Sequence, residues 1–304
     1  MARRFCFVPF EPPSGFAVEL SDTPFFAQTQ YHCGPAALAT LLAADGLEVT
    51  PEELTPLVYV PERHGSLQAE MLAATRQYQR IPLRLQPDPA ELISALDAGS
   101  PVLVLQNLGL ESLPVWHYAV VIGFDSQSNK FVLRSGEDER LEVRAQIFLK
   151  SWDLAGRWAF IAAHADHVAP MATPASWIAA AAPFESIGNS ALARRAYLAA
   201  QAQWPADALS RLAMANLEYS EGDLDAALTQ LSEAVHYAPD DVAARNNLAQ
   251  VLLEKQCPAS ARAQMDRIID IPAWLQDAVS QTRAEIDGAG DQDAPECAGL
   301  PGQR

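Results

Sequence analysis

A spacing of 34 residues recurs along the second half of the chain and limits the folds open to that half. Gly188 and Gly222 stand 34 residues apart, and Gln256 occupies the next position in the series. The same interval links two further sets of residues: Ala193, Ala227 and Ala261, and Pro205 and Pro239. A period of this length is typical of small helical units that bury their apolar faces by stacking on one another. The alternative is an alanine-rich helical bundle without a structural repeat.

The period resembles that of the tetratricopeptide repeat, in which a small residue marks the turn between two helices, alanine lies in the second helix and proline closes the unit. Residues 223–228 (DLDAAL) resemble the second helix of that family, and residues 246–249 (NNLA) resemble the first. The resemblance implies an all-α array of about two and a half to three units over residues 177–285. It also implies that a protein partner binds the helical repeats.

Composition narrows the class of partner. The chain has 304 residues, enough for about two domains, and 49% of them are hydrophobic, so a sizeable core can form. The net charge of −17 argues against nucleic acid and against anionic membrane surfaces, because both attract Lys and Arg. No apolar run reaches the roughly 18 residues of a membrane helix. We therefore expect no nucleic acid and no membrane span, and basic or neutral peptides and proteins stay open as substrate or partner.

The N-terminus and the cysteines bear on the cellular compartment. Only residues 5–8 of the opening MARRFCFVPFEPP are uninterruptedly apolar, which is too short for a secretory signal. The chain is expected to be cytoplasmic as the sequence stands; the alternative is an exported or membrane-anchored protein if the true start lies upstream. The four cysteines lack metal-ligand spacing and are expected to be free thiols. No cofactor and no metal are expected.

The first half of the chain mixes helical and strand-like patterns. Helices are expected over residues 35–44, 51–57, 66–79 and 89–98. Strands are expected over residues 101–106, 117–124 and 130–134, and further strands over 141–143 and 158–162. Helices followed by an antiparallel sheet make this half an α+β domain. A segment with two prolines (166–176) reads as a linker, and the Gly-, Pro- and Asp-rich end (286–304) is expected to be disordered.

Cys33 lies at the start of the first expected helix, in the stretch QTQYHCGPAALA. Free amides and the positive end of the dipole at a helix N-terminus favour a thiolate, and the thiolate is the nucleophilic form of cysteine. A cysteine nucleophile also needs a base, and His117 opens a strand that would hold it rigidly. The amide of Gln28, five residues before Cys33, could donate to a developing oxyanion. The alternative is an ordinary buried cysteine with an unrelated histidine.

The stretch from Gln28 to Cys33 and on to Ala39 resembles the nucleophile motif of the bacteriocin-processing peptidases, papain-like enzymes that cut leader peptides after a double glycine. WHYAVVIGFD, from Trp116, resembles the histidine strand of that family. The similarity covers residues 23–165, which leaves residues 1–22 as an N-terminal extension. It implies a papain-like fold with Cys33 as nucleophile, His117 as base and Gln28 as oxyanion donor.

One position departs from the family pattern. An aspartate normally closes the triad on the strand after the histidine, and Ser135 occupies the matching position. A serine hydroxyl can orient an imidazole, but it cannot offset imidazolium charge as a carboxylate does. Glu137 or Asp138 could substitute if the following turn folds back, although acidic residues in a turn are usually solvated.

Together these features predict a cysteine peptidase whose repeats recruit a substrate or partner. Cys33 would attack a peptide carbonyl, His117 would protonate the leaving amine, and Gln28 would stabilise the oxyanion. The alternative is a catalytically weak or inactive peptide-binding adaptor that keeps the fold, a reading that Ser135 favours. Transfer of the acyl group to an amine would use the same pair and stays open.

Overall fold

Capping residues and prolines set the beginnings of the first helices. Helix α2 (Pro51–Val58) starts with the expected capping box: the Glu53 amide donates to the Thr50 hydroxyl, and the Thr50 amide donates to the Glu53 carboxylate. Asp88 caps α4 (Pro89–Asp97) in a similar way. The other two helices of this group are α1 (Cys33–Ala44) and α3 (Gln68–Gln77). Helix α1 begins two residues before the expected start, so Cys33 is its first residue.

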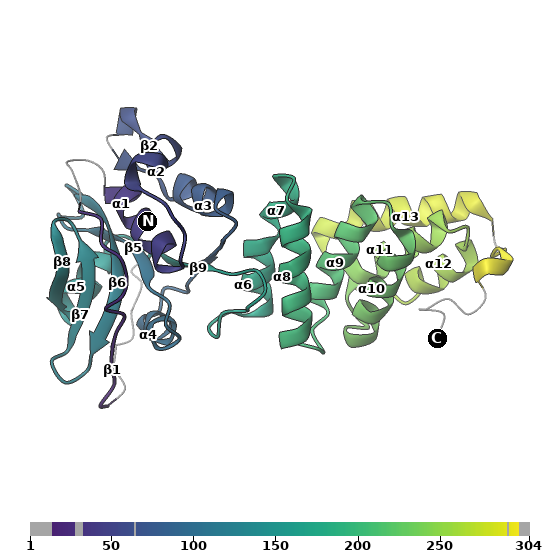
Figure 1. Cartoon of the computed structure of the whole chain (residues 1–304). Coiled ribbons are helices and arrows are strands. Elements are labelled where there is room, and N and C mark those ends of the chain that lie inside the picture. The colour runs from purple at the N-terminus through teal and green to yellow at the C-terminus, as the bar shows by residue number, and fades with distance from the viewer. Residues whose placement is uncertain (1–13, 28–32, 64, 291, 298–304) are drawn as a thin grey trace. The chain divides into compact units, whose positions relative to one another are not determined.

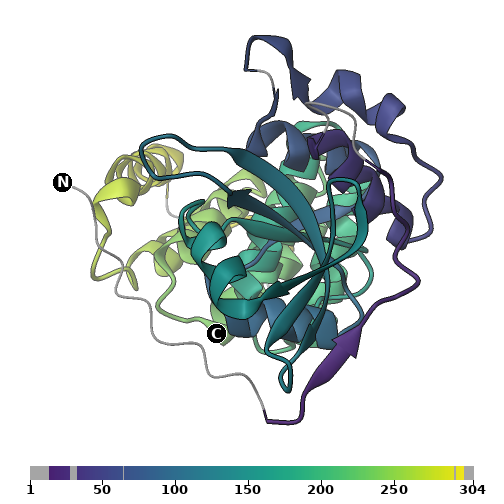
Figure 2. The ribbon, with the colours of Figure 1, turned by 90° about the vertical axis from the view of Figure 1, so that its left-hand side faces the viewer.

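The computed structural model describes residues 14–27, 33–63, 65–290 and 292–297 and divides at residues 172 and 173 into two units (Figure 1). Within the described residues of the first unit, seven antiparallel strands form one sheet (Figure 2). Their order is β4-β9-β5-β6-β7-β8, with β1 beside β6. Its strands are β1 (Ala17–Glu19), β4 (Ile81–Arg84), β5 (Val102–Asn107), β6 (Trp116–Asp125), β7 (Lys130–Ser135), β8 (Asp138–Arg144) and β9 (Ala159–Ala163). A separate pair, β2 (Tyr59–Val60) and β3 (Gly65–Ser66), follows α2 and the short η1 (Pro61–Arg63). The expected antiparallel sheet is confirmed.

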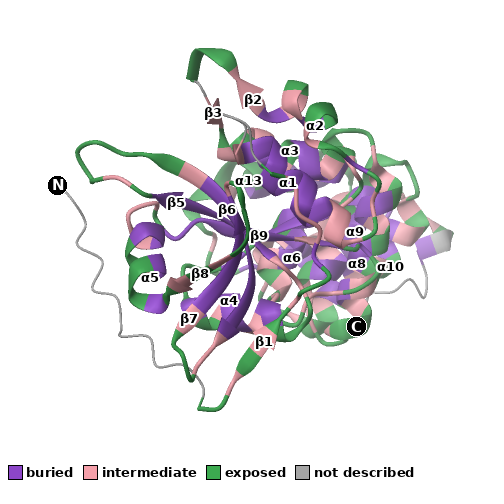
Figure 3. Ribbon diagram, turned by 60° about the vertical axis from the view of Figure 1, so that its left-hand side comes forward, coloured by how far each residue is buried: buried purple, intermediate pink, exposed green. Residues whose placement is uncertain are grey.

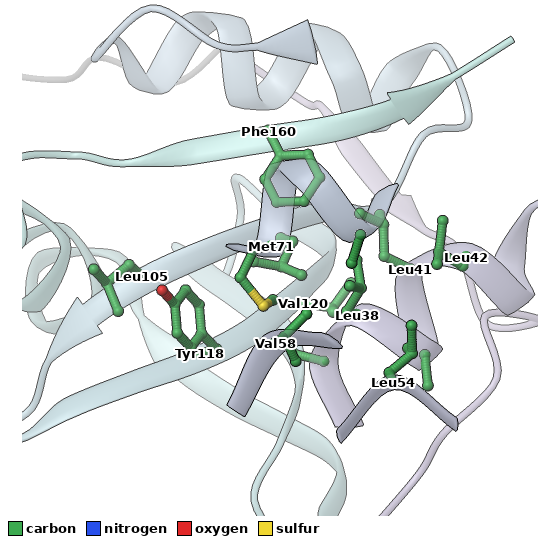
Figure 4. Packing of buried hydrophobic residues seen from close by; sticks show 14 of the residues in the cluster. Leu38, Leu41, Leu42, Leu54, Val58, Met71, Leu105, Tyr118, Val120 and Phe160 are labelled. Atoms are coloured by element: carbon green, nitrogen blue, oxygen red, sulfur yellow. The ribbon is translucent and has the colours of Figure 1, made fainter. Parts of the chain in front are cut away.

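The two faces of the sheet have different covers. Tyr118 and Val120 of β6 belong to a core cluster with α1, α2 and α3, and Figure 4 shows their side chains beside Leu38 and Met71. On the other face, α5 (Ala145–Asp153) contributes Phe148, and the centroid of its ring lies 4.4 Å from the ring centroid of Phe131 in β7. Strands β5, β6 and β7 are consequently buried along most of their length (Figure 3). The alternation of strand side chains assigns each residue near the site to one face.

The second unit is helical in its described residues, and the 34-residue series has a backbone cause. Its elements are α6 (Pro174–Ala181), α7 (Pro183–Ser186), α8 (Ser190–Gln203), α9 (Leu209–Ser220), α10 (Leu224–Tyr237), α11 (Val242–Glu254), α12 (Pro258–Met265), η2 (Ala273–Leu275), α13 (Gln276–Ala289) and η3 (Pro295–Cys297). Gly188, Gly222 and Gln256 have φ of 79°, 84° and 60°. A left-handed residue therefore ends one helix of each pair at the same place, a conformation that glycine adopts without strain.

The end of the chain differs from expectation. Helix α13 continues to Ala289, and Ile286 is buried, so disorder does not begin at residue 286. The expectation of free thiols is also wrong for two cysteines, because Cys257 and Cys297 form a disulfide across 40 residues and are both buried. Their separation in the sequence gave no spacing signal. Cys33 is a free thiol.

The last segment supplies a cap that the repeat has lost. Asn189 and Asp223 cap α8 and α10 with their side chains, but the third position in the series is Cys257, which has no side-chain cap bond. Asp293 provides one instead: its carboxylate accepts from the Ala259 amide at 2.7 Å and from the Ser260 amide at 3.2 Å. The disulfide holds the segment that carries Asp293 in this position.

Replacing Asp293 by alanine is expected to lower the free energy of unfolding of the second unit by about 1 kcal/mol, the usual effect of losing a helix N-cap. Urea denaturation of the full chain, followed by helical circular dichroism, measures the change. Asp293→Asn is the matched control, because an asparagine oxygen still accepts from the two amides. Equal loss in both variants would show that the charge, and not the cap, stabilises α12.

Candidate active site

Three elements meet around the thiol of Cys33. As the first residue of α1, Cys33 lies where backbone amides have no partner within the helix. Gly34 allows β3 to approach closely, because a Cβ at this position would lie 2.1 Å from Oγ of Ser66. The Tyr118 hydroxyl then donates to the Ser66 carbonyl at 3.2 Å and ties β3 to β6. The thiol is partly buried between these elements and packs against the core cluster.

Burial sets the ionisation of the thiol. Desolvation raises the pKa of Cys33, while the backbone amides of Tyr118, Gly34 and Cys33 itself act in the opposite direction. The raised pKa differs from the sequence-based expectation that the helix start would favour the thiolate. The Tyr118 amide also locates the thiol, since Tyr118 directly follows His117 along β6. Cys33 and the histidine strand are thus neighbours.

His117 is held by a hydrogen bond to Ser135. Its Nε2 lies 2.8 Å from Oγ of Ser135, and the other ring nitrogen, Nδ1, takes no part in this bond. The imidazole is largely desolvated, which lowers the pKa of His117. Cys33 and His117 therefore rest as a neutral thiol and a neutral imidazole at pH 7.

The sheet register brings Ser135 to this place. Val120 of β6 pairs with Arg134 of β7, so Ser135 comes level with the residue two places beyond His117 and on the same face. Ser135 is the last residue of β7 and is buried. Glu137 and Asp138 follow it in the exposed turn to β8, and the hydrogen bond of His117 goes to the serine.

A pocket of about 400 Å³ opens beside His117 and Ser135 on the face that α5 covers. Its remaining lining residues come from β5, the β5–β6 connection, β7, β8, α5 and the residue after it: Gln106, Asn107, Leu108, Gly109, Leu133, Leu141, Val143, Ile147, Lys150, Ser151 and Leu154. Gln106 pairs with His117 across the two strands, and its Nε2 donates to Oγ of Ser151 at 2.7 Å. In the sequence, Gln106 ends an expected strand, where a position near the cleft and a role in the turn are equally compatible with it, and no helix is expected over α5.

Gln28 lies outside the described residues, as do Gln30, Tyr31 and His32. The chain before them is well anchored. The Arg134 guanidinium donates to the carbonyls of Thr23 and Ser21 at 2.7 and 2.8 Å, and Phe26 packs against the core cluster. Among the described residues, no group of three His, Cys, Asp or Glu side chains could hold a metal ion. No helix in the described ranges is long and apolar enough to cross a bilayer.

Comparisons with known proteins identify the family that each unit resembles. The model of the Peptidase_C39 like family matches residues 20–160, and that of the tetratricopeptide repeat matches residues 212–274. A solved structure of a C39-like peptidase from Bacillus anthracis is 18% identical, with a TM-score of 0.42, over 48% of this chain and 97% of that chain. The search of curated proteins finds no match. The protein therefore consists of a Peptidase C39-like domain followed by a helical unit with tetratricopeptide repeats.

Proposed function

We propose that the first unit is a cysteine peptidase in which Cys33 is the nucleophile, His117 the base and Ser135 the residue that orients the base. The observation that supports this most directly is the bond from Nε2 of His117 to Ser135, together with the Tyr118 amide beside the Cys33 thiol. A Nε2–H tautomer that donates to the serine leaves the lone pair of Nδ1 available for the thiol proton. A base and a nucleophile from separate elements then act as a pair.

The reaction starts from the neutral pair. Sγ of Cys33 attacks the carbonyl carbon of a peptide bond while its proton passes to Nδ1 of His117, which gives a tetrahedral oxyanion. The Cys33 amide and the side chain of Gln28 stabilise this oxygen. The imidazolium then protonates the amine as the C–N bond breaks, leaving an acyl-enzyme. Water, deprotonated by His117, hydrolyses the thioester and restores the thiol.

Incubating the full chain and its Cys33→Ala variant with a mixture of synthetic peptides tests the proposal. New peptide termini, identified by mass spectrometry, are expected only with the unchanged protein. Parallel incubations with and without an added amine distinguish hydrolysis from acyl transfer, since a hydrolase yields free carboxylates without the amine, whereas a transferase forms its product only when the amine is present. Identical peptide profiles from both proteins would show that the domain has no peptidase activity on these peptides.

A peptide-binding adaptor is the second candidate, and two observations favour it. Ser135 provides no negative charge to stabilise an imidazolium, and burial raises the pKa of Cys33. Such a protein would bind peptides with similar affinity whether or not Cys33 is present, and it would release them unchanged. The same incubation distinguishes it from the enzyme, because a peptide that binds but is never cut identifies the adaptor.

In either case the repeats would bind a protein partner or present the substrate. Stacked helical pairs form extended surfaces of the kind used in recognition, and three helices of this array, α9, α10 and α11, pack on one another in sequence order. The test compares the full chain with a form lacking residues 173–304, and it measures both partner binding and cleavage of short peptides. Loss of a partner without loss of cleavage of short peptides would assign recruitment to the repeats.

The disulfide between Cys257 and Cys297 favours an oxidising compartment over the cytoplasm expected from the sequence, because cytosolic thiols are kept reduced. Labelling of thiols in freshly lysed cells, before and after reduction, measures the state of both cysteines. We expect Cys257 and Cys297 to react only after reduction, whereas Cys33 reacts without reduction once the protein is denatured. Labelling of all three without reduction would place the protein in a reducing compartment.

A further inference from the structure

The pocket beside His117 offers apolar surface, because its polar groups already bond one another. The Gln106 amide donates to the Ser151 hydroxyl, which in turn donates to the Phe148 carbonyl at 2.8 Å. The Ser135 hydroxyl is engaged by His117. The other walls are the aliphatic side chains of Leu108, Leu133, Leu141, Val143, Ile147 and Leu154. A volume of about 400 Å³ lies within the range of small-ligand sites, and such sites are mostly apolar.

The apolar surface continues out of the pocket along the β5–β6 connection. Leu108 lines the pocket and is half exposed, and three residues that follow it are among the most exposed large hydrophobic side chains of the described chain: Leu110 (66%), Leu113 (72%) and Val115 (57%). Contiguous exposed apolar residues usually mark an interaction site. We call Leu108, Leu110, Leu113 and Val115 the apolar hairpin.

Hydrogen bonds of the Asn107 side chain hold the backbone of the apolar hairpin in one conformation. Oδ1 of Asn107 accepts from the amides of Gly109 and Val115, both at 2.9 Å, and its Nδ2 donates to the Leu110 carbonyl at 3.2 Å. Gly109 is required for this close packing, because a Cβ there would lie 2.4 Å from the Leu113 carbonyl oxygen. The buried Asn107 side chain thus fixes the connection from within. A fixed apolar surface loses little entropy when a ligand binds.

Charge limits what the surface binds. Lys150 is the one charged residue among those that line the pocket, and it is exposed. The chain as a whole has a net charge of −17, which disfavours the anionic headgroups of a membrane. The surface also runs directly to the imidazole of His117, where the proposed reaction takes place. A substrate polypeptide suits these conditions better than a lipid surface does.

From these observations we infer that the pocket and the apolar hairpin bind a substrate segment with bulky aliphatic side chains close to the scissile bond. One side chain fills the pocket beside His117, and a second, two residues along an extended peptide, lies against the apolar hairpin, since alternate side chains of an extended chain share one side. The inference rests on the proposed peptidase function for its biological meaning. Peptide binding is measured with a variant that lacks the Cys33 thiol, so the result does not depend on cleavage.

The test uses the full chain with Cys33→Ala and leucine and valine methyl groups labelled for NMR. The probes are acetyl-Ala-Leu-Ala-Leu-amide and the matched acetyl-Ala-Gly-Ala-Gly-amide. The leucine peptide is expected to shift the methyl resonances of Leu141 and Val143 and to bind at least about tenfold more tightly than the glycine peptide, since each buried aliphatic side chain adds favourable transfer free energy. Equal affinity for both peptides, or shifts confined to other regions, would overturn the inference.

Two tryptophan variants on α5 locate the binding. Ile147→Trp narrows the pocket and is expected to weaken binding of the leucine peptide about tenfold. Gln146→Trp adds the same ring at an exposed position outside the lining and is expected to leave affinity unchanged. An equal effect of both variants would contradict the assignment. If the leucine peptide binds the pocket but the unchanged protein never cuts it, the peptidase proposal fails and the inference on peptide binding holds. If only the glycine peptide is cut, the peptidase proposal holds and the inference on peptide binding fails.

Discussion

Replacing His117 by alanine is expected to slow Cys33-dependent peptide cleavage by about 10²–10⁴-fold, the usual contribution of a general base. The loss should be large because burial raises the pKa of the Cys33 thiol, so little thiolate forms at neutral pH without a proton acceptor. Single-turnover cleavage of one peptide by the two proteins measures the ratio. The variant should recover part of its rate as the pH rises, since hydroxide then removes the thiol proton.

His167→Ala is the matched control for that experiment. His167 lies far along the chain, after β9, and is exposed. Its loss is expected to leave cleavage unchanged at every pH. If His117→Ala and His167→Ala cleave peptide at the same rate, His117 is not the base, and the bond to Ser135 has only a structural role.

The second large effect concerns Ser135→Asp. A carboxylate in place of the Ser135 hydroxyl, whose Oγ lies 2.8 Å from Nε2 of His117, would stabilise the imidazolium, so the pKa of His117 should rise by about 1 unit or more from its lowered value. Each unit increases the population of the thiolate–imidazolium form about tenfold. Peptide cleavage near pH 8 is therefore expected to rise about tenfold, while the acid limb of its pH profile moves to higher pH.

Ser135→Asn separates charge from hydrogen bonding. An asparagine oxygen can accept from Nε2 of His117, but it carries no charge, so neither the rate nor the acid limb should rise. The pKa of His117, measured by NMR titration of the ring protons, gives an independent reading. Because Ser135 is buried, thermal unfolding establishes that both variants fold. A raised His117 pKa without faster cleavage would show that the serine does not limit the rate.

Local sequence was enough for much of the fold. The capping box at Thr50 and Glu53 and the prolines at helix starts identify α2 and α4, and hydrophobic runs identify β5 and β6. Among the elements that the sequence did not predict, β4 and α5 were missed for clear physical reasons. Strand β4 has only four residues, too few to show a period, and the apolar residues of α5 were not separated from those of the strands on either side. In both segments, packing against the rest of the fold determines which secondary structure forms.

The candidate site was predictable in residue type and less so in geometry. A cysteine at a helix start and a histidine at a strand start are visible in the sequence, but the bond between His117 and Ser135 depends on strand register. That register includes an irregularity between Val121 and Gly123 that shifts the pairing of β7. The pKa of Cys33 also escaped prediction, because desolvation by the surrounding elements outweighs the helix start. Such burial is a property of the whole fold.

The most direct test of the account is the pH dependence of Cys33 alkylation by iodoacetamide, followed by mass spectrometry of the labelled peptide. Between the lowered pKa of His117 and the raised pKa of Cys33, the fraction of the pair in the thiolate–imidazolium form does not change with pH. Attack by Cys33 with proton transfer to His117 is therefore expected to give a plateau in rate above the lowered pKa of His117, with a fall at lower pH and a rise where free thiolate takes over towards the raised pKa of Cys33. In His117→Ala the plateau should disappear, and the rate should rise about tenfold per pH unit. The same log-linear rise in both proteins would contradict the claim that Cys33 and His117 act as a pair.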